Sequence, residues 1–263
     1  CQRIVKDLFN DDHFREKINM SGVNSINWAR IICQIVYYFF TFFQLKKDEL
    51  SFSVPTGNFG DIYAGYIAKK MGLPINKLIV ATNENDILQR VINTGEYKPD
   101  KVKPSLSPSM DIQVSSNFER LLFYILQEDD RKVDLLMNNL KDNGFFKLEI
   151  NELKEIKKDF VAAKVSDEET LSIIKDVYEK NKFLIDPHTA TAFGAINKVK
   201  GINEVVALGT AHPYKFFETM KKATGENIEP PVQIKKYLDK DEKFDIIENN
   251  ISKIKKYIHT KIK

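Results

Sequence analysis

The sequence predicts an α/β protein in which helices flank a parallel sheet. Short apolar runs alternate with amphipathic segments between residues 20 and 82, which is typical of strands and helices in turn. The runs LIVAT at 78–82 and VVALGTA at 205–211 resemble strands buried in the middle of such a sheet. Residues 52–74, FSVPTGNFGDIYAGYIAKKMGLP, combine an apolar strand, a glycine-containing turn and an amphipathic helix.

The expected elements follow one another along the chain. We expect a helix over 1–18, a helix over 28–43, a strand over 51–54, a helix over 61–71 and a strand over 77–81. Residues 96–109 are rich in Pro, Lys and Ser and predict a long loop, which in a compact domain is functional or disordered. A helix over 118–126 and two charged amphipathic helices follow, and the sheet pattern resumes only after Asp186.

These segments predict three parts. Residues 1–100 form the first part of a cofactor-binding α/β domain, and residues 186–263 return to that domain and end in helices. Residues 101–185 are either a helical insertion or part of a second subdomain, and the sequence does not choose between the two. Lysines alternate with isoleucines at helical spacing after residue 250, which predicts a solvated face of a terminal helix.

Composition and charge exclude several classes of function. Of 263 residues, 43% are hydrophobic and 29% charged, and 40 basic against 37 acidic residues give a net charge of only +3. Because basic and acidic residues are interleaved, binding to nucleic acid is not indicated. Cys1 and Cys33 lack metal or redox spacing, so we expect a reducing compartment, the cytoplasm, and no metal.

The most apolar stretch, residues 31–45, is interrupted by Gln34, Thr41 and Gln44. It falls short of the roughly 20 apolar residues that span a bilayer. We therefore expect a buried helix and no association with a membrane.

The turn at Gly57–Asp61 is predicted to hold a phosphate group. Gly57 and Gly60 let backbone N–H groups turn inward, Asn58 can cap the following helix, and the helix dipole adds positive potential. The turn lacks the Gly-Lys-Ser/Thr ending of a P-loop and the glycine spacing of a dinucleotide site. The carboxylate of Asp61 would also repel a triphosphate. One small phosphate is therefore expected, with an ordinary strand-to-helix turn as the alternative.

Three further clusters bring polar residues together. Residues 24–30, NSINWAR, place Ser25, Asn27 and Arg30 at a helix start, where they either bind a second anion or cap the helix. Residues 186–195, DPHTATAFGA, predict a helix entered through a proline, and residues 208–216, LGTAHPYKF, end a strand with Thr210. His188 is more typical of a hydrogen-bonded core residue than of a catalyst. Ligands of open α/β sheets lie at the carboxyl ends of strands, so the turn and Thr210 are expected to converge.

Taken together, five blocks identify a resemblance to a known family. NSINWARI, PTGNFGDIYAGYIAKKMGLP, SPSMDIQVSSNFERLLF, DPHTATAFGA and LGTAHPYKF, in this order and at these intervals, resemble bacterial and fungal threonine synthases. These enzymes depend on pyridoxal 5'-phosphate and have the tryptophan-synthase-β fold type, fold type II. The resemblance extends over most of the chain.

The resemblance implies roles for particular residues. Gly57, Asn58, Phe59, Gly60 and Asp61 would bind the cofactor phosphate, and Thr210 would hydrogen-bond the pyridine nitrogen. Ser25, Asn27 and Arg30 would help to hold the substrate. The implied reaction converts O-phospho-L-homoserine and water to L-threonine and phosphate.

One departure from the family pattern concerns the lysine that bonds covalently to the cofactor. The family carries it in a Phe-Lys-Asp motif, upstream of the NSIN block, and this motif does not occur in the chain. Lys47 and Lys158 each precede an aspartate but lack the preceding phenylalanine. The catalytic residue is therefore not identified, and we expect a carboxyl-terminal portion, incomplete at its amino end and inactive alone, that needs the amino-terminal portion of the same polypeptide.

Two alternatives remain open at this point. The chain could be a non-catalytic remnant that keeps a phosphate-binding scaffold. It could also belong to another fold type II enzyme that acts on a different amino acid.

Overall fold

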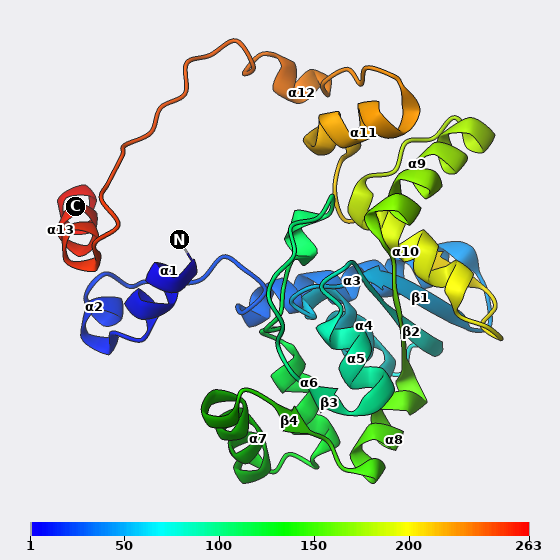
Figure 1. Ribbon diagram of the computed structural model, residues 1–263, viewed down its shortest axis with the longest axis horizontal. Helices are drawn as coiled ribbons and strands as arrows, with labels where there is room; N and C mark the ends of the chain where they lie inside the picture. Colours follow the sequence, from blue (N-terminus) through cyan, green and yellow to red (C-terminus); the bar gives the residue numbers. More distant parts are fainter. Residues whose placement is uncertain (1, 263) are drawn as a thin grey trace. The chain divides into compact units, whose positions relative to one another are not determined.

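A computed structural model describes residues 2–262 as two compact units (Figure 1). The larger unit is Ser25–Pro230, and the smaller unit combines Cys1–Asn24 with Pro231–Lys263. The candidate site residues all lie in the larger unit.

Within the described residues, the larger unit is built on a parallel sheet with the strand order β5-β2-β1-β6. The strands are β1 (Leu50–Pro55), β2 (Ile75–Thr82), β5 (Phe160–Lys164) and β6 (Val205–Ala207). Val54 of β1 pairs with Val80 of β2, and Phe52 pairs with Val206 of β6 on the other side. Because these pairings are parallel, all four strands end at the same edge of the sheet.

The helices of the larger unit are α3 (Trp28–Leu45), α4 (Gly60–Lys70), α5 (Ile87–Thr94), α6 (Phe118–Ile125), α7 (Asp130–Asn143), α8 (Ile150–Asp159), α9 (Asp167–Asn181), α10 (Pro187–Lys198) and α11 (Phe217–Thr224). Two short 3-10 helices, η1 (Pro108–Met110) and η2 (Pro213–Phe216), and a small antiparallel pair, β3 (Glu96–Tyr97) with β4 (Phe146–Lys147), complete it.

The larger hydrophobic core lies on one face of the sheet. Alternate residues of β1 and β2, such as Phe52 and Leu78, point into it and pack with residues from α3, α4, α5, α6 and α8. The Tyr38 ring of α3 is buried and meets the Phe52 ring edge-on at a centroid distance of 4.9 Å. Burial of large aromatic side chains of this kind supplies much of the driving force for folding.

Small residues allow α10 to lie close against the other face. Ile79 and Ala81 of β2 pack with Ala192 and Ala195 of α10. The Ser53 hydroxyl donates a hydrogen bond of 2.8 Å to the carbonyl oxygen of Ala192. This close contact fixes the position of the α10 amino end relative to the strand ends.

The smaller unit contains α1 (Gln2–Phe9), α2 (Asp12–Lys17), α12 (Val232–Lys235) and α13 (Ile251–Lys261). Lys255 of α13 forms an ion pair with Asp11, and the His259 ring lies 5.4 Å from the Phe14 ring. Residues from both ends of the chain therefore pack together in this unit.

The fold class expected from the sequence is confirmed, and three local expectations are wrong. The single helix over 1–18 is interrupted, because Asp11 caps α2 by accepting a hydrogen bond from the Phe14 N–H. The sheet resumes before Asp186, because β5 already pairs with β2. α3 is buried along only one side, and Val36 and Phe40 on its other side are 60% and 63% exposed. The division at residues 100 and 185 stays a prediction.

Across residues 2–262, none of the helices is both long enough and apolar enough to cross a bilayer.

The contact between α3 and α4 predicts that Gly65 tolerates no side chain. A β-carbon at Gly65 would lie 2.6 Å from Cε1 of Tyr38 and 2.9 Å from Cδ2 of Leu78. We expect Gly65→Ala to lower the free energy of unfolding by about 1–3 kcal/mol, although alanine favours helices by roughly 1 kcal/mol. Urea denaturation measures this, with Ser172→Ala on the exposed side of α9 as the control. A stabilised Gly65→Ala variant would contradict the packing described here.

Candidate functional site

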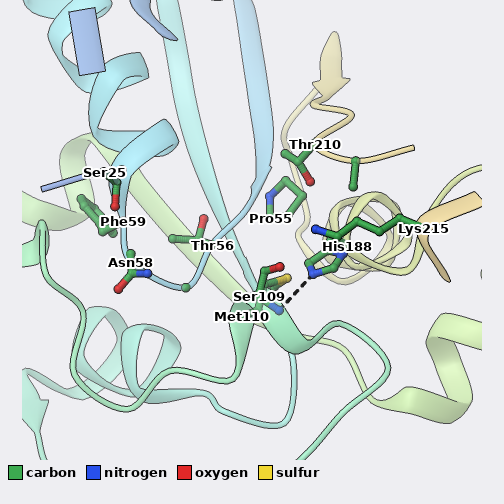
Figure 2. A pocket seen from close by; sticks show the side chains of 13 residues that line it. Ser25, Pro55, Thr56, Asn58, Phe59, Ser109, Met110, His188, Thr210 and Lys215 are labelled. Atoms are coloured by element: carbon green, nitrogen blue, oxygen red, sulfur yellow. Dashed lines mark hydrogen bonds between the residues drawn. The ribbon is translucent and has the colours of Figure 1, made fainter. Parts of the chain in front are cut away.

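A cavity of about 210 Å³, here called the turn cavity, lies where β1 and β6 end (Figure 2). Its walls come from the β1–α4 turn, the loop that contains η1, the amino end of α10 and the segment after β6. The lining residues are Ser25, Pro55, Thr56, Gly57, Asn58, Phe59, Gly60, Ser109, Met110, His188, Thr210, Ala211 and Lys215.

Phe59 forms the tight part of the β1–α4 turn. It precedes α4 in the left-handed conformation with a φ of 62°, which is strained for an aromatic residue. Its side chain is buried, with the rings of Phe118 and Phe160 at 5.4 and 5.5 Å. This packing holds the strained turn in place.

The amino end of α4 has no side-chain cap. The expectation that Asn58 caps it is wrong, because Oδ1 of Asn58 accepts a hydrogen bond from the Ser116 hydroxyl at 3.3 Å. The Asn58 carbonyl oxygen is held by the backbone and side chain of Asn117, at 3.1 and 2.9 Å. The first N–H groups of α4 have no intrahelical acceptor and can therefore donate to an anion.

The two glycines of the turn are needed for close approach rather than for a positive φ. A β-carbon at Gly57 would lie 3.0 Å from the carbonyl oxygen of Ser109 and from Cα of Met110. One at Gly60 would lie 2.8 Å from Cβ of Ser25. The left-handed residue of the turn is Phe59. That the glycines let backbone N–H groups turn inward toward a ligand stays a prediction.

The loop after β3 is ordered by a buried polar network. Asp111 accepts hydrogen bonds on Oδ1 from the Asn83 and Asn85 amides at 2.8 and 3.0 Å and from the Ser105 hydroxyl at 2.6 Å. Asn83 and Asn85 directly follow β2, so the network fastens the loop to the strand ends. The loop, which was expected to be functional or disordered, is ordered, and it places Ser109 in the wall of the turn cavity. A functional role for the loop stays a prediction.

His188 lies in the cavity wall and is buried. Its Nε2 accepts a hydrogen bond of 3.2 Å from the Ser109 N–H, and its Nδ1 lies 3.0 Å from Oδ1 of Asp186 (Figure 2). An acceptor Nε2 and a neighbouring carboxylate at Nδ1 assign the neutral ring with its proton on Nδ1. The sequence-based reading of His188 as a hydrogen-bonded residue agrees with this geometry.

Lys215 was missed by the sequence analysis. It brings the one ammonium group among the described residues that line the turn cavity, and Figure 2 shows its side chain extending across the cavity towards Pro55. Lys215 follows Thr210 by five residues in the LGTAHPYKF block, and the short helix η2 turns it back to the strand ends. An exposed lysine in a short 3-10 helix carries no local signal of this role, so only the fold reveals it.

A second cavity of about 590 Å³, here called the α3 cavity, lies beside α3. It is lined by Ala29, Arg30, Cys33, Gln34, Tyr37, Asp61, Leu208, Gly209 and Thr210. The Tyr38 hydroxyl donates to the carbonyl oxygen and to Oδ1 of Asp61, at 2.8 and 3.2 Å. Burial raises the pKa of Asp61 to about 6, although the Tyr38 hydrogen bond opposes the shift.

The candidate residues are therefore divided between the two cavities. Ser25 and the turn residues from Gly57 to Gly60 line the turn cavity, Arg30 and Asp61 line the α3 cavity, and Thr210 lines both. Asn27 caps α3, where its Oδ1 accepts a hydrogen bond of 3.0 Å from the Ala29 N–H. Their roles toward a ligand stay predictions.

No group of three or more His, Cys, Asp or Glu side chains that could hold a metal ion occurs among residues 2–262.

The fold and the cavity define a class of protein. This is an α/β protein whose parallel strands end at one edge of the sheet, beside the uncapped amino end of α4 and the ammonium group of Lys215. Such an arrangement suits a small phosphorylated ligand. A family model described as threonine synthase, C-terminal, matches residues 189–258.

Comparison with individual proteins specifies the family. Threonine synthase of Saccharomyces cerevisiae is 48% identical over 247 residues, covering 85% of this chain and 48% of that protein. Threonine synthase of Pseudomonas aeruginosa is 44% identical over 263 residues, covering 98% of this chain and 56% of that protein. The crystal structure of pyridoxal-phosphate-bound threonine synthase from Brucella melitensis has a TM-score of 0.93 and 44% identity, over 100% of this chain and 57% of that chain.

The chain belongs to the threonine synthase family, and the resemblance found in its sequence blocks is confirmed. It spans about half the length of the curated relatives that it matches.

The raised pKa of Asp61 predicts a pH-dependent stability. The unfolded carboxyl loses its proton near its ordinary pKa of 3.8, whereas the folded one keeps it until about pH 6. The folded state binds more protons between these values, so stability falls as pH rises through this window. Asp61→Asn removes this penalty and keeps an acceptor for Tyr38.

We expect Asp61→Asn to stabilise the chain by on the order of 2 kcal/mol more at about pH 7.5 than at about pH 4, as urea unfolding would measure. The control, Asp176→Asn, removes an exposed carboxylate from α9. An equal pH-dependent gain in both variants would assign the effect to net charge rather than to burial.

Proposed function

We propose that this chain is the carboxyl-terminal portion of a threonine synthase that converts O-phospho-L-homoserine and water to L-threonine and phosphate. The observation that supports it most directly is that the turn residues 57–60 and Thr210, which the family resemblance assigns to the two ends of pyridoxal phosphate, line the same cavity. The cytoplasm is the proposed location.

The donor set of the turn cavity suits a phosphate monoester. Uncapped N–H groups at the start of α4 supply hydrogen bonds and the positive end of a helix dipole. Lys215 adds an ammonium group, which offsets part of the charge of a dianion. When bound, pyridoxal phosphate supplies a conjugated ring that accepts electron density from carbon atoms losing a proton.

Thr210 sets the electronic character expected of that ring. A hydroxyl can donate to a pyridine nitrogen that carries no proton, whereas a carboxylate would keep the nitrogen protonated. With Thr210 as partner, the ring is a moderated electron acceptor. His188 has its Nε2 occupied by the Ser109 N–H, so its role in this state is to hold the cavity wall.

The covalent lysine of the family is expected in the amino-terminal portion of the same polypeptide, because the Phe-Lys-Asp motif does not occur in these 263 residues. We propose that this portion is the partner of the present chain and that the chain alone has no activity. The same portion would complete the substrate site around Ser25, Asn27 and Arg30.

The test uses the complete protein that contains this chain. We expect added pyridoxal phosphate to give a long-wavelength absorbance band that borohydride bleaches, and phosphohomoserine to release inorganic phosphate together with threonine. The 263-residue chain, assayed in parallel, should release none. Absence of the band would support a non-catalytic remnant, and turnover of a serine or cysteine derivative in place of phosphohomoserine would indicate another fold type II enzyme.

A lysine substitution tests the charge balance of the site. We expect Lys215→Met in the complete protein to weaken binding of pyridoxal phosphate about 10- to 100-fold, because a charge-assisted hydrogen bond is lost. Lys215→Arg should restore most of the affinity. Titration followed by absorbance measures this, with the exposed Lys222→Met on α11 as the control.

Binding of pyridoxal, which lacks the phosphate, shows whether Lys215 meets the phosphate of the cofactor or that of the substrate. If Lys215 meets the cofactor phosphate, Lys215→Met should leave pyridoxal binding unchanged. If it meets the substrate phosphate, cofactor affinity should persist and the KM for phosphohomoserine should rise. Unchanged values for all three ligands would remove Lys215 from the site.

A further inference from the structure

Asp186 makes more contacts than capping a helix requires. It is 1% exposed and precedes α10, where its Oδ1 accepts a hydrogen bond of 2.9 Å from the His188 N–H. This bond alone would cap the helix. The carboxylate also accepts from two side chains, His188 through Nδ1 at 3.0 Å and Thr189 through its hydroxyl.

The first of these side chains holds one wall of the turn cavity. Because the Nδ1 proton of His188 faces Asp186, Nε2 presents a lone pair, and the Ser109 N–H donates to it at 3.2 Å. The opposite tautomer would place a proton against the Ser109 N–H. Asp186 therefore determines whether this bond to the loop can form.

The second side chain holds the segment after β6. The Thr189 hydroxyl gives its proton to Asp186, so its lone pairs are free to accept from the Thr210 N–H at 3.4 Å. Thr189 is 6% exposed and can turn to few other partners. Asp186 thus fixes the direction of this hydroxyl as well.

We propose that Asp186 is a positioning residue of the turn cavity: through His188 and Thr189, one buried carboxylate holds the Ser109 loop and the Thr210 segment in place. The proposal deepens the proposed function and rests on it only for the identity of the ligand between these walls. The bonds themselves join residues of this chain.

The charge state of Asp186 is consistent with this role. Burial would raise its pKa, but the hydrogen bonds from His188 and Thr189 outweigh burial and hold the pKa below its ordinary value. The amino end of the α10 dipole favours the same negative charge. The carboxylate is therefore an acceptor on both oxygens at neutral pH.

Two conservative substitutions separate positioning from capping. Asp186→Asn keeps an oxygen for the helix cap, but this neutral amide oxygen is a weaker acceptor for the Nδ1 proton of His188 than a carboxylate is. The NH₂ group that replaces the other oxygen cannot accept the Thr189 proton. Thr189→Val removes the acceptor for the Thr210 N–H together with one donor to Asp186, and leaves the His188 bonds to Asp186 in place. The control is Thr170→Val, which removes a buried threonine hydroxyl near the start of α9 that donates to the Ser166 carbonyl oxygen.

The measurement is amide hydrogen exchange in the ligand-free complete protein, together with ¹⁵N NMR of the His188 ring. Ser109 and Thr210 are exposed residues, so their amide protection depends on these bonds. We expect Asp186→Asn to speed exchange at both amides by about tenfold and to shift the ring away from a single Nδ1-protonated tautomer. Thr189→Val should speed exchange at Thr210 alone, and Thr170→Val at neither.

Unchanged exchange at Ser109 and Thr210 in Asp186→Asn would overturn the proposal, as would equal acceleration in Thr170→Val. Titration with pyridoxal phosphate then tests the proposed function separately. If the variants change amide exchange as expected but the complete protein does not bind pyridoxal phosphate, the positioning role of Asp186 is supported and the proposed function is refuted.

Discussion

The parallel pairing of β1 with β2 on one side and β6 on the other is the constraint on which the site depends. It brings the ends of β1 and β6 to one edge of the sheet, so that the Gly57–Gly60 turn and Thr210, about 150 residues apart in the chain, line the same cavity. A shift of register by one residue would reverse the faces of β1 and turn Phe52 and Val54 toward α10, which packs closely on that face. The burial that stabilises the fold therefore also fixes the geometry of the site.

Packing at the strand ends leaves little freedom in this arrangement. Phe59 keeps a left-handed conformation because its ring is enclosed by other aromatic rings. Gly57 lies against the backbone of the Ser109 loop, and Asp111 fastens that loop to the end of β2. A preorganised set of N–H donors costs less conformational entropy when an anion binds. The cavity is thus shaped by contacts among the chain's own residues.

Local patterns predicted the fold class, the strand–turn–helix unit and the approach of Thr210, because hydrophobic periodicity and glycine placement are properties of short segments. The missed features depend on tertiary contacts. Asn58 was expected to cap α4, but its side chain is held by Ser116, 58 residues away. β5 lies between the charged helices α8 and α9, and its short strand pattern was not distinguished from theirs in the sequence. Lys215 lies in the short helix η2, and only its position in the fold brings it to the cavity.

The central claim is that one phosphorylated ligand bridges the β1–α4 turn and Thr210. The most direct test is a crystal structure of the complete protein with pyridoxal phosphate. The account predicts phosphate oxygens about 2.7–3.2 Å from the N–H groups between Gly57 and Gly60, and the Thr210 hydroxyl beside the ring nitrogen. A phosphate bound in the α3 cavity beside Arg30, with the turn cavity unchanged, would contradict it.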